Sequence, residues 1–130
     1  MKVMIVDDHQ GMRAMLRSLL PISRFEVCEC KDGAEAVGTF ARFQPAWVLM
    51  DVSMKDTDGI AATRLLTAAF PGAQVVMVMD SLDVQLRKAA LNAGACAFVA
   101  KENLLEIRSL LESPPGAASF QSSSPSQLSS

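Results

Sequence analysis

The fold is decided by the stretch Trp47-Val-Leu-Met-Asp51-Val-Ser-Met-Lys-Asp-Thr-Asp-Gly59. Its first four residues are apolar without alternation, which is typical of a strand buried on both faces in a parallel sheet covered by helices. A polar segment suited to a loop follows Asp51, and we expect Gly59 to supply backbone angles that other residues avoid. Ligands bind at the carboxyl ends of the strands in such sheets, so Asp51 is a candidate site residue.

Two further apolar runs also end in charged residues. Residues 3–6 are followed by Asp7 and Asp8, and residues 98–100 are followed by Lys101. For a single aspartate, the alternative is a solvated or helix-capping side chain, and Asp8 could cap the first helix. Three carboxylates gathered at one edge would repel one another, and a divalent cation with oxygen ligands, such as Mg²⁺, would offset that repulsion. A carboxylate beside the ion could then attack a phosphoryl group, with Lys101 stabilising the charge.

The remainder of the chain alternates strand-like and helix-like segments. Strands are predicted at 2–6, 25–30, 46–50, 74–79 and 97–100, and helices at 10–20, 32–43, 58–70, 84–93 and 102–111. This alternation indicates βαβ units with right-handed crossovers. We therefore predict an α/β fold with a doubly wound, five-stranded parallel sheet of order 2-1-3-4-5. Strand 25–30 is mixed in polarity and is placed at an edge, and helix 84–93 has a thin apolar face, which makes it a candidate for movement.

The inward helix faces follow from periodicity. They comprise Met12, Leu16, Leu19, Leu20, Ala36, Val37, Phe40, Ala41, Leu86, Ala89, Ala90, Leu104, Ile107 and Leu111. Glycine at position 94 is expected just beyond a helix C-terminus.

Composition narrows the function further. The chain has 130 residues, half of them hydrophobic, and a net charge of −2 without a basic block, which argues against direct nucleic-acid binding. No apolar run approaches the roughly 20 residues of a membrane helix, and the chain opens on a strand without room for a signal peptide. We expect a cytoplasmic protein whose three cysteines are reduced thiols. Residues 1–112 form one predicted domain, and residues 113–130 read as a disordered Pro/Ser-rich tail.

Three motifs in order carry a family resemblance. Residues 5–9 (Ile-Val-Asp-Asp-His), residues 51–59 and residues 92–101 resemble the receiver domain of two-component response regulators, with its CheY-like, flavodoxin-like fold. The match runs from residue 2 to about residue 112. The segment around Arg13 and residues 16–20 is most similar to the branch usually fused to a helix-turn-helix output domain, and no such output domain is expected here.

The resemblance implies roles for the charged residues. Asp51 matches the phospho-acceptor, and Asp7 and Asp8 match the acidic pair that holds Mg²⁺, Asp8 directly and Asp7 through water. Ser53 lies where a backbone carbonyl is a further metal ligand. Lys101 matches the lysine that pairs with the phosphoryl oxygens.

Other positions match residues that take part in the conformational change on activation in this family. Phe98 matches the aromatic residue that turns inward on activation, and plain core packing is the alternative. Met79 stands where the family has Thr or Ser, and its thioether cannot donate a hydrogen bond. Ser81 is the alternative hydroxyl. Lys55 replaces a common proline after Met54.

Three functions are then compared. The first is a stand-alone receiver, not a dedicated enzyme, phosphorylated by a histidine kinase or phosphotransfer protein. Its face from strand four to helix five would bind an effector or a second copy. The second is a pseudo-receiver that binds partners independently of phosphorylation, which Met79 favours. The third is an aspartyl phosphatase, which the Asp-Asp-His order disfavours because those enzymes use Asp-x-Asp. His9 is expected to be a solvated residue near a helix start.

Overall fold

The computed structural model describes residues 1–55, 58–80 and 84–112, and these contain the ten predicted elements. In order they are β1 (Lys2–Val6), α1 (Gln10–Ser18), β2 (Glu26–Cys30), α2 (Ala36–Phe43), β3 (Trp47–Asp51), α3 (Gly59–Ala69), β4 (Val75–Met79), α4 (Val84–Asn92), β5 (Ala97–Ala100) and α5 (Glu106–Leu111). Short 3₁₀ turns at Gly33–Glu35 and Lys101–Asn103 precede α2 and α5, so both helices begin later than predicted. Ser81 and the predicted tail lie outside the described residues.

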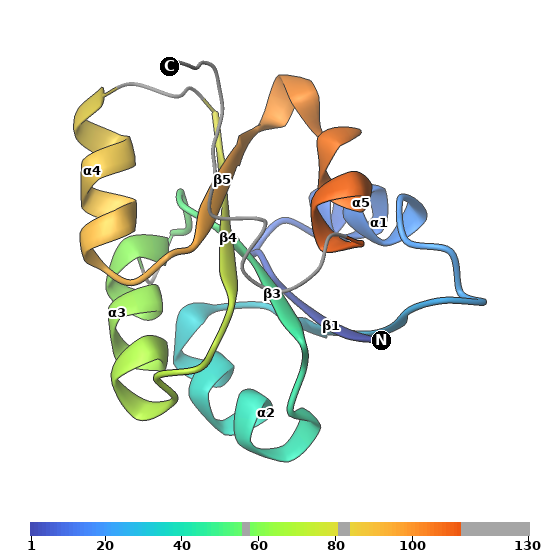
Figure 1. Cartoon of the computed structure of the whole chain (residues 1–130), viewed down its shortest axis with the longest axis horizontal. Helices are drawn as coiled ribbons and strands as arrows, with labels where there is room; N and C mark the ends of the chain where they lie inside the picture. The colour runs from blue at the N-terminus through green and yellow to red at the C-terminus, as the bar shows by residue number, and fades with distance from the viewer. Residues whose placement is uncertain (56–57, 81–83, 113–130) are drawn as a thin grey trace.

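The five strands form one parallel sheet in the order β2-β1-β3-β4-β5, as predicted, with β2 at an edge. Figure 1 shows the sheet crossing the molecule between its helices. Two register pairs matter for function. Val6 of β1 pairs with Met50 of β3, and Met79 of β4 pairs with Ala100 of β5. Residues that follow these pairs are therefore held side by side at the carboxyl edge.

Helices cover both faces of the sheet (Figure 1). Alternate strand residues belong to two core clusters because successive side chains of a strand point to opposite faces. One cluster joins the strands to α1 and α5 through Leu16, Ile107 and Leu111. The other joins them to α2, α3 and α4. Every residue of β3 and β4 is buried, which explains their continuous apolar runs.

One predicted inward position is wrong. Ala41 is exposed, whereas Ala36 and Phe40 are the buried residues of α2. The helix presents a narrow stripe of residues four apart, and a residue one position further turns away from it. Phe40 stacks on Phe70 with ring centroids 4.5 Å apart, which completes the cover on this side.

The C-terminal ends of α3 and α4 are joined to each other. Thr67 Oγ1 of α3 donates to the Ala93 carbonyl beyond α4 at 2.8 Å. Gly94 follows with φ +110°, as expected of a glycine beyond a helix end, and a Cβ there would lie 2.6 Å from Thr67 Oγ1. Both backbone angle and space therefore require glycine at this position.

Among the described residues, no helix combines the length and the apolar character needed to cross a bilayer.

Candidate functional site

Three carboxylates gather at the carboxyl edge of the sheet, as predicted. Asp7 follows the last residue of β1, and Asp51 ends β3, so the pairing of Val6 with Met50 brings the two together. One ligand atom each from Asp7, Asp8 and Asp51 lies within 4.8 Å of the others. The prediction that these three carboxylates gather at one edge is confirmed by this geometry, and we call the site that they form the acidic cleft.

Asp7 is the most buried member, with no exposed surface. Its Oδ1 accepts a hydrogen bond from the His9 backbone N–H at 2.8 Å. Its Oδ2 is buried and has no hydrogen-bond partner among the described residues. Burial raises the pKa of this carboxyl, the His9 N–H opposes the rise, and the charge of Asp51 adds to it. An unpartnered buried carboxylate is costly, so this atom marks a place where a cation would be stabilising.

Asp51 is 3% exposed. Its Oδ1 lies 3.2 Å from Lys101 Nζ and accepts the Ser53 N–H at 3.3 Å. Both of these contacts engage Oδ1. Burial raises the pKa of Asp51, and the ammonium of Lys101 is the largest influence in the opposite direction.

Asp8 lies closer to solvent, and its Oδ2 accepts the Lys55 backbone N–H at 2.7 Å. The alternative in which Asp8 caps the first helix is wrong. His9 is the N-cap of α1, because its extended backbone lets Nδ1 accept the Met12 N–H at 3.2 Å. His9 is exposed at the helix start, as expected. Asp8 is thus left free of the helix and faces the cleft.

Lys101 follows β5 and reaches Asp51 at the end of β3, across the intervening strand β4. It also meets a residue that sequence reasoning missed. Its Nζ lies 3.2 Å from Asp80 Oδ1 as well as 3.2 Å from Asp51 Oδ1. Burial lowers the pKa of Lys101, but the two carboxylates together outweigh it, and the pKa is raised. The signal available in the sequence was the position of Asp80 directly after a buried strand.

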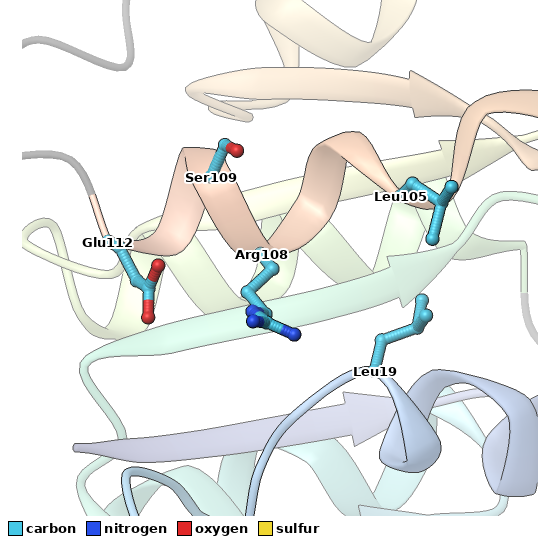
Figure 2. A pocket seen from close by; sticks show the side chains of 5 residues that line it. All are labelled: Leu19, Leu105, Arg108, Ser109 and Glu112. Atoms are coloured by element: carbon cyan, nitrogen blue, oxygen red, sulfur yellow. The ribbon is translucent and has the colours of Figure 1, made fainter.

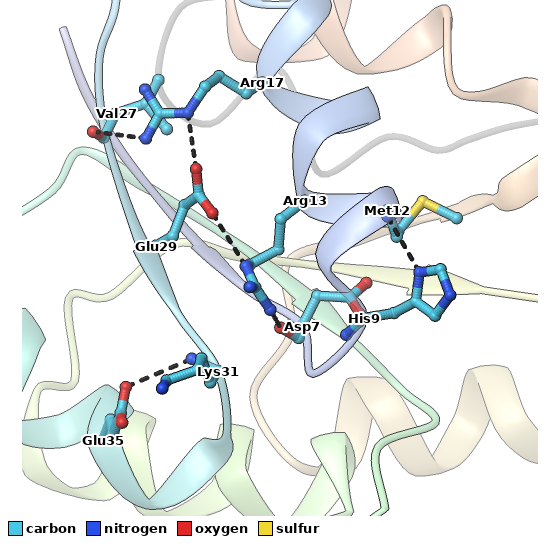
Figure 3. Close-up of polar contacts among 9 residues, drawn as sticks. All are labelled: Asp7, His9, Met12, Arg13, Arg17, Val27, Glu29, Lys31 and Glu35. Carbon is cyan, nitrogen blue, oxygen red and sulfur yellow. Dashed lines mark hydrogen bonds and ion pairs between the residues drawn. The ribbon is translucent and has the colours of Figure 1, made fainter.

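A second missed feature is the polar network behind the site (Figure 3). Arg13 donates from Nη1 to the Asp7 backbone carbonyl at 2.6 Å and from Nε to Glu29 Oε1 at 2.9 Å. Arg17 donates to the other Glu29 oxygen at 2.7 Å, and this bond is the main reason that the pKa of Glu29 is lowered. The network fixes α1 against the end of β1 and against edge strand β2.

Gly59 is required by space rather than by backbone angle, which corrects the expectation from sequence. Among the described glycines, only Gly94 has a positive φ. A Cβ at Gly59 would lie 2.0 Å from the Asp51 backbone oxygen. Helix α3 therefore begins in direct contact with the main chain of the acidic cleft, with Asp58 as its N-cap.

The predicted switch residues lie near Lys101 in different environments. Met79 ends β4 opposite Ala100, the residue before Lys101, and its side chain is fully buried in the core. Phe98 is partly buried against the same core cluster, with Arg87 Cζ 5.9 Å from its ring centroid. Core packing of Phe98 is thus observed, and its role in activation stays a prediction. Ser81 lies outside the described residues.

The raised pKa values of Asp7 and Asp51 predict an unusual pH dependence of stability without metal. Between the ordinary value of 3.8 and the raised native values, the folded chain binds more protons than the unfolded chain. The free energy of unfolding should therefore increase as pH falls from neutral through this window. Below it, Glu29 loses its ion pairs, and stability should fall.

Urea unfolding in chelator, from pH 7 to about pH 5, measures this effect. Asp7→Asn is the comparison, because it lacks one of the two groups and should show a flatter profile. Parallel profiles for the two proteins, both falling toward acid, would contradict the prediction. Added Mg²⁺ should remove the increase because the ion competes with protons for the same oxygens.

Comparison with known proteins identifies the family to which this chain belongs. The family model of the response regulator receiver domain matches residues 3–112. The chemotaxis protein CheY of Halobacterium salinarum is 35% identical over 101 residues, covering 77% of this chain and 83% of that protein. CheY of Thermotoga maritima is 32% identical over 101 residues, covering 77% of this chain and 84% of that protein.

Solved structures agree with the sequence relatives. A two-component response regulator of the LuxR family from Aurantimonas sp. SI85-9A1 superposes with a TM-score of 0.78 at 26% identity, covering 85% of this chain and 81% of that chain. The response regulator domain of Thermotoga maritima CheB gives 0.74 at 28% identity, covering 86% and 91%. Because the family model spans nearly all of the described residues and its relatives match over most of their length, this chain belongs to the CheY-like receiver domains of two-component response regulators.

Proposed function

We propose that this receiver accepts a phosphoryl group on Asp51 from the phosphohistidine of a histidine kinase or phosphotransfer protein. One arrangement carries the proposal. Ligand atoms of three carboxylates lie within 4.8 Å of one another, while Lys101 Nζ lies 3.2 Å from the proposed acceptor. Such a cluster is poorly suited to structural capping and well suited to holding a cation beside an ammonium.

The donor set fits Mg²⁺. Asp7, Asp8 and Asp51 offer carboxylate oxygens, and the Ser53 carbonyl is the proposed fourth protein ligand. The buried Oδ2 of Asp7, without a described partner, is the observation that favours a cation here. When bound, Mg²⁺ supplies positive charge that lowers the repulsion between the acidic cluster and an incoming phosphoryl group.

In the proposed step, Asp51 Oδ2 attacks phosphorus, because Oδ1 is already engaged by Lys101 and Ser53. A P–O bond forms as the P–N bond to the donor imidazole breaks, and the electron pair returns to that nitrogen. Lys101 then pairs with phosphoryl oxygens and stabilises the charge. Attack of water on phosphorus reverses the modification, releasing inorganic phosphate and the Asp51 carboxylate. The domain is thus a phospho-acceptor rather than a dedicated enzyme.

The proposed output surface is the α4-β5-α5 face. Val84 and Leu91 of α4 and Leu105 at the start of α5 are 55%, 50% and 81% exposed, so these elements offer apolar side chains to a partner. Helix α4 has Ala90 as its buried residue, so few contacts oppose its displacement. The partner proposed for this face is an effector protein or a second copy of the chain.

A shallow groove of about 300 Å³ continues this surface between α5 and α1. Figure 2 shows Leu105 and Leu19 projecting toward each other at one end of the groove, and Arg108 and Glu112 lie further along α5. The mixture of apolar and charged side chains fits a protein surface better than a small-molecule ligand. The three free thiols fit a reducing compartment, and we propose a cytoplasmic location.

One observation favours the pseudo-receiver as a second candidate. Met79 is fully buried and cannot donate a hydrogen bond to a phosphoryl oxygen. In that case Asp51 could still be modified, but α4 would not respond. The two candidates differ in whether phosphorylation of Asp51 changes the conformation of α4.

Incubation of the whole chain with Mg²⁺ and acetyl phosphate tests the proposal. We expect a mass increase of one phosphoryl group on Asp51, and none in chelator. Amide hydrogen exchange over α4 then separates the two candidates. Faster or slower exchange on phosphorylation supports the switching receiver, and unchanged exchange with full uptake supports the pseudo-receiver. Failure of uptake with Mg²⁺ present overturns the switching receiver and leaves the module that binds partners independently of phosphorylation.

A further inference from the structure

The ammonium of Lys101 is shared by two carboxylates. Its Nζ is 3.2 Å from Asp51 Oδ1 and 3.2 Å from Asp80 Oδ1. The sheet imposes this sharing, because Met79 pairs with Ala100 and each is followed at once by one member of the second ion pair. The contact thus arises from backbone register rather than from a chance meeting of long surface side chains.

The two carboxylates of this arrangement differ in environment. The side chain of Asp51 is 3% exposed, whereas that of Asp80 is 70% exposed and that of Lys101 is 23% exposed. Exposed ion pairs are weak, so Asp80 can release the ammonium at small cost. An ammonium has three N–H donors, and a phosphoryl group brings up to three acceptor oxygens and about two negative charges. Asp80 and a phosphoryl group on Asp51 would therefore compete for the same donors.

We propose that Asp80 is a positioning residue that competes with the phosphoryl group for Lys101, an inference that rests on the proposed function. In the unmodified chain Asp80 holds Nζ at the mouth of the cleft. On modification of Asp51 it gives up the ammonium and remains as a nearby negative charge. Asp80 therefore lowers the affinity of the cleft for phosphoryl-like anions and limits how long the modified state lasts.

Beryllofluoride, titrated into the Mg²⁺-loaded chain and followed by calorimetry, tests this competition. We expect Asp80→Asn to bind it roughly two- to fivefold more tightly than the natural chain, as loss of a weak exposed ion pair predicts. Mg²⁺ titrated alone should bind slightly more weakly to Asp80→Asn, because the cleft has lost one negative charge. Opposite signs in the two titrations distinguish competition from a loosened site, which would weaken both.

Glu102→Gln is the matched control. It removes the same charge next to Lys101 in sequence, and Glu102 is exposed and makes no ion pair with any described residue. Its affinity for beryllofluoride should change less than that of Asp80→Asn. In a Lys101→Met background, Asp80→Asn should lose its effect, because the shared donor is gone.

The outcomes separate the two proposals. If the natural chain with Mg²⁺ does not bind beryllofluoride, the proposed function fails. If it binds, but Asp80→Asn binds equally or more weakly, the inference about Asp80 is overturned and the proposed function stands. An effect of Asp80→Asn that equals the control, or that persists without Lys101, also overturns the inference.

Discussion

Asp51→Asn is expected to abolish phosphoryl uptake from acetyl phosphate, with a loss of at least about a hundredfold in rate. The amide is a poor nucleophile and carries no negative charge to hold the cation. The fold should survive, because the replacement has the same shape and removes a buried carboxylate whose pKa is already raised by burial. Intact-protein mass spectrometry after a fixed incubation measures uptake, and thermal unfolding reports on the fold.

Asp58→Asn serves as the control for this experiment. Asp58 lies in the same loop region and caps α3 by accepting the Ile60 N–H at 2.9 Å. Asparagine caps helices about as well as aspartate, so structure and uptake should both be retained. Labelling of Asp51→Asn at the rate of the natural chain would end the assignment of Asp51 as acceptor.

Gly59→Ala is expected to cost about 3 kcal/mol or more in the free energy of unfolding. The added Cβ would lie 2.0 Å from the Asp51 backbone oxygen and 2.8 Å from Val52 Cα, and both are backbone atoms of the buried strand end. Either α3 moves away from β3 or the strand end shifts, and Mg²⁺ binding should weaken with it. Urea unfolding and a Mg²⁺ titration measure the two effects.

Gly38→Ala provides the matched comparison. Gly38 lies in α2, and a Cβ there would meet Arg42 Nη1 at 3.6 Å, an ordinary contact with a flexible side chain. Alanine should raise stability by roughly 0.5–1 kcal/mol because it favours the helix. Equal stabilities for Gly59→Ala and the natural chain would show that the start of α3 can move freely, which the close contact argues against.

Much of this architecture could be predicted because strands that are buried on both faces require unbroken runs of apolar residues. The unbroken apolar runs of β3 and β4 correspond to strands with every residue buried. The order of strands then follows from the alternation with helices, and it brings Asp7 and Asp51 to one edge. The acidic cleft was predictable because a charged residue directly after a buried run is conspicuous.

Other features depend on geometry that composition and periodicity do not carry. Asp80 directly follows a buried run, but the run does not say which residue Asp80 meets, and the register of β4 with β5 is what brings it to Lys101. Gly59 reads as a turn residue, whereas the contact with Asp51 is set by how closely α3 approaches the strand. His9 replaces Asp8 as the cap because the turn after β1 is one residue longer than capping by Asp8 would need.

The hydrogen bond from Thr67 to the Ala93 carbonyl has a mechanical consequence for α4. It tethers the helix at the end remote from the acidic cleft, while the opposite end lies closer to Asp80 in sequence. A helix held at its C-terminal end rotates about that end rather than translating as a whole. A small displacement near Asp80 would therefore move Val84 most and Leu91 little. A partner protein should therefore detect the proposed phosphorylation of Asp51 mainly at the first turn of α4.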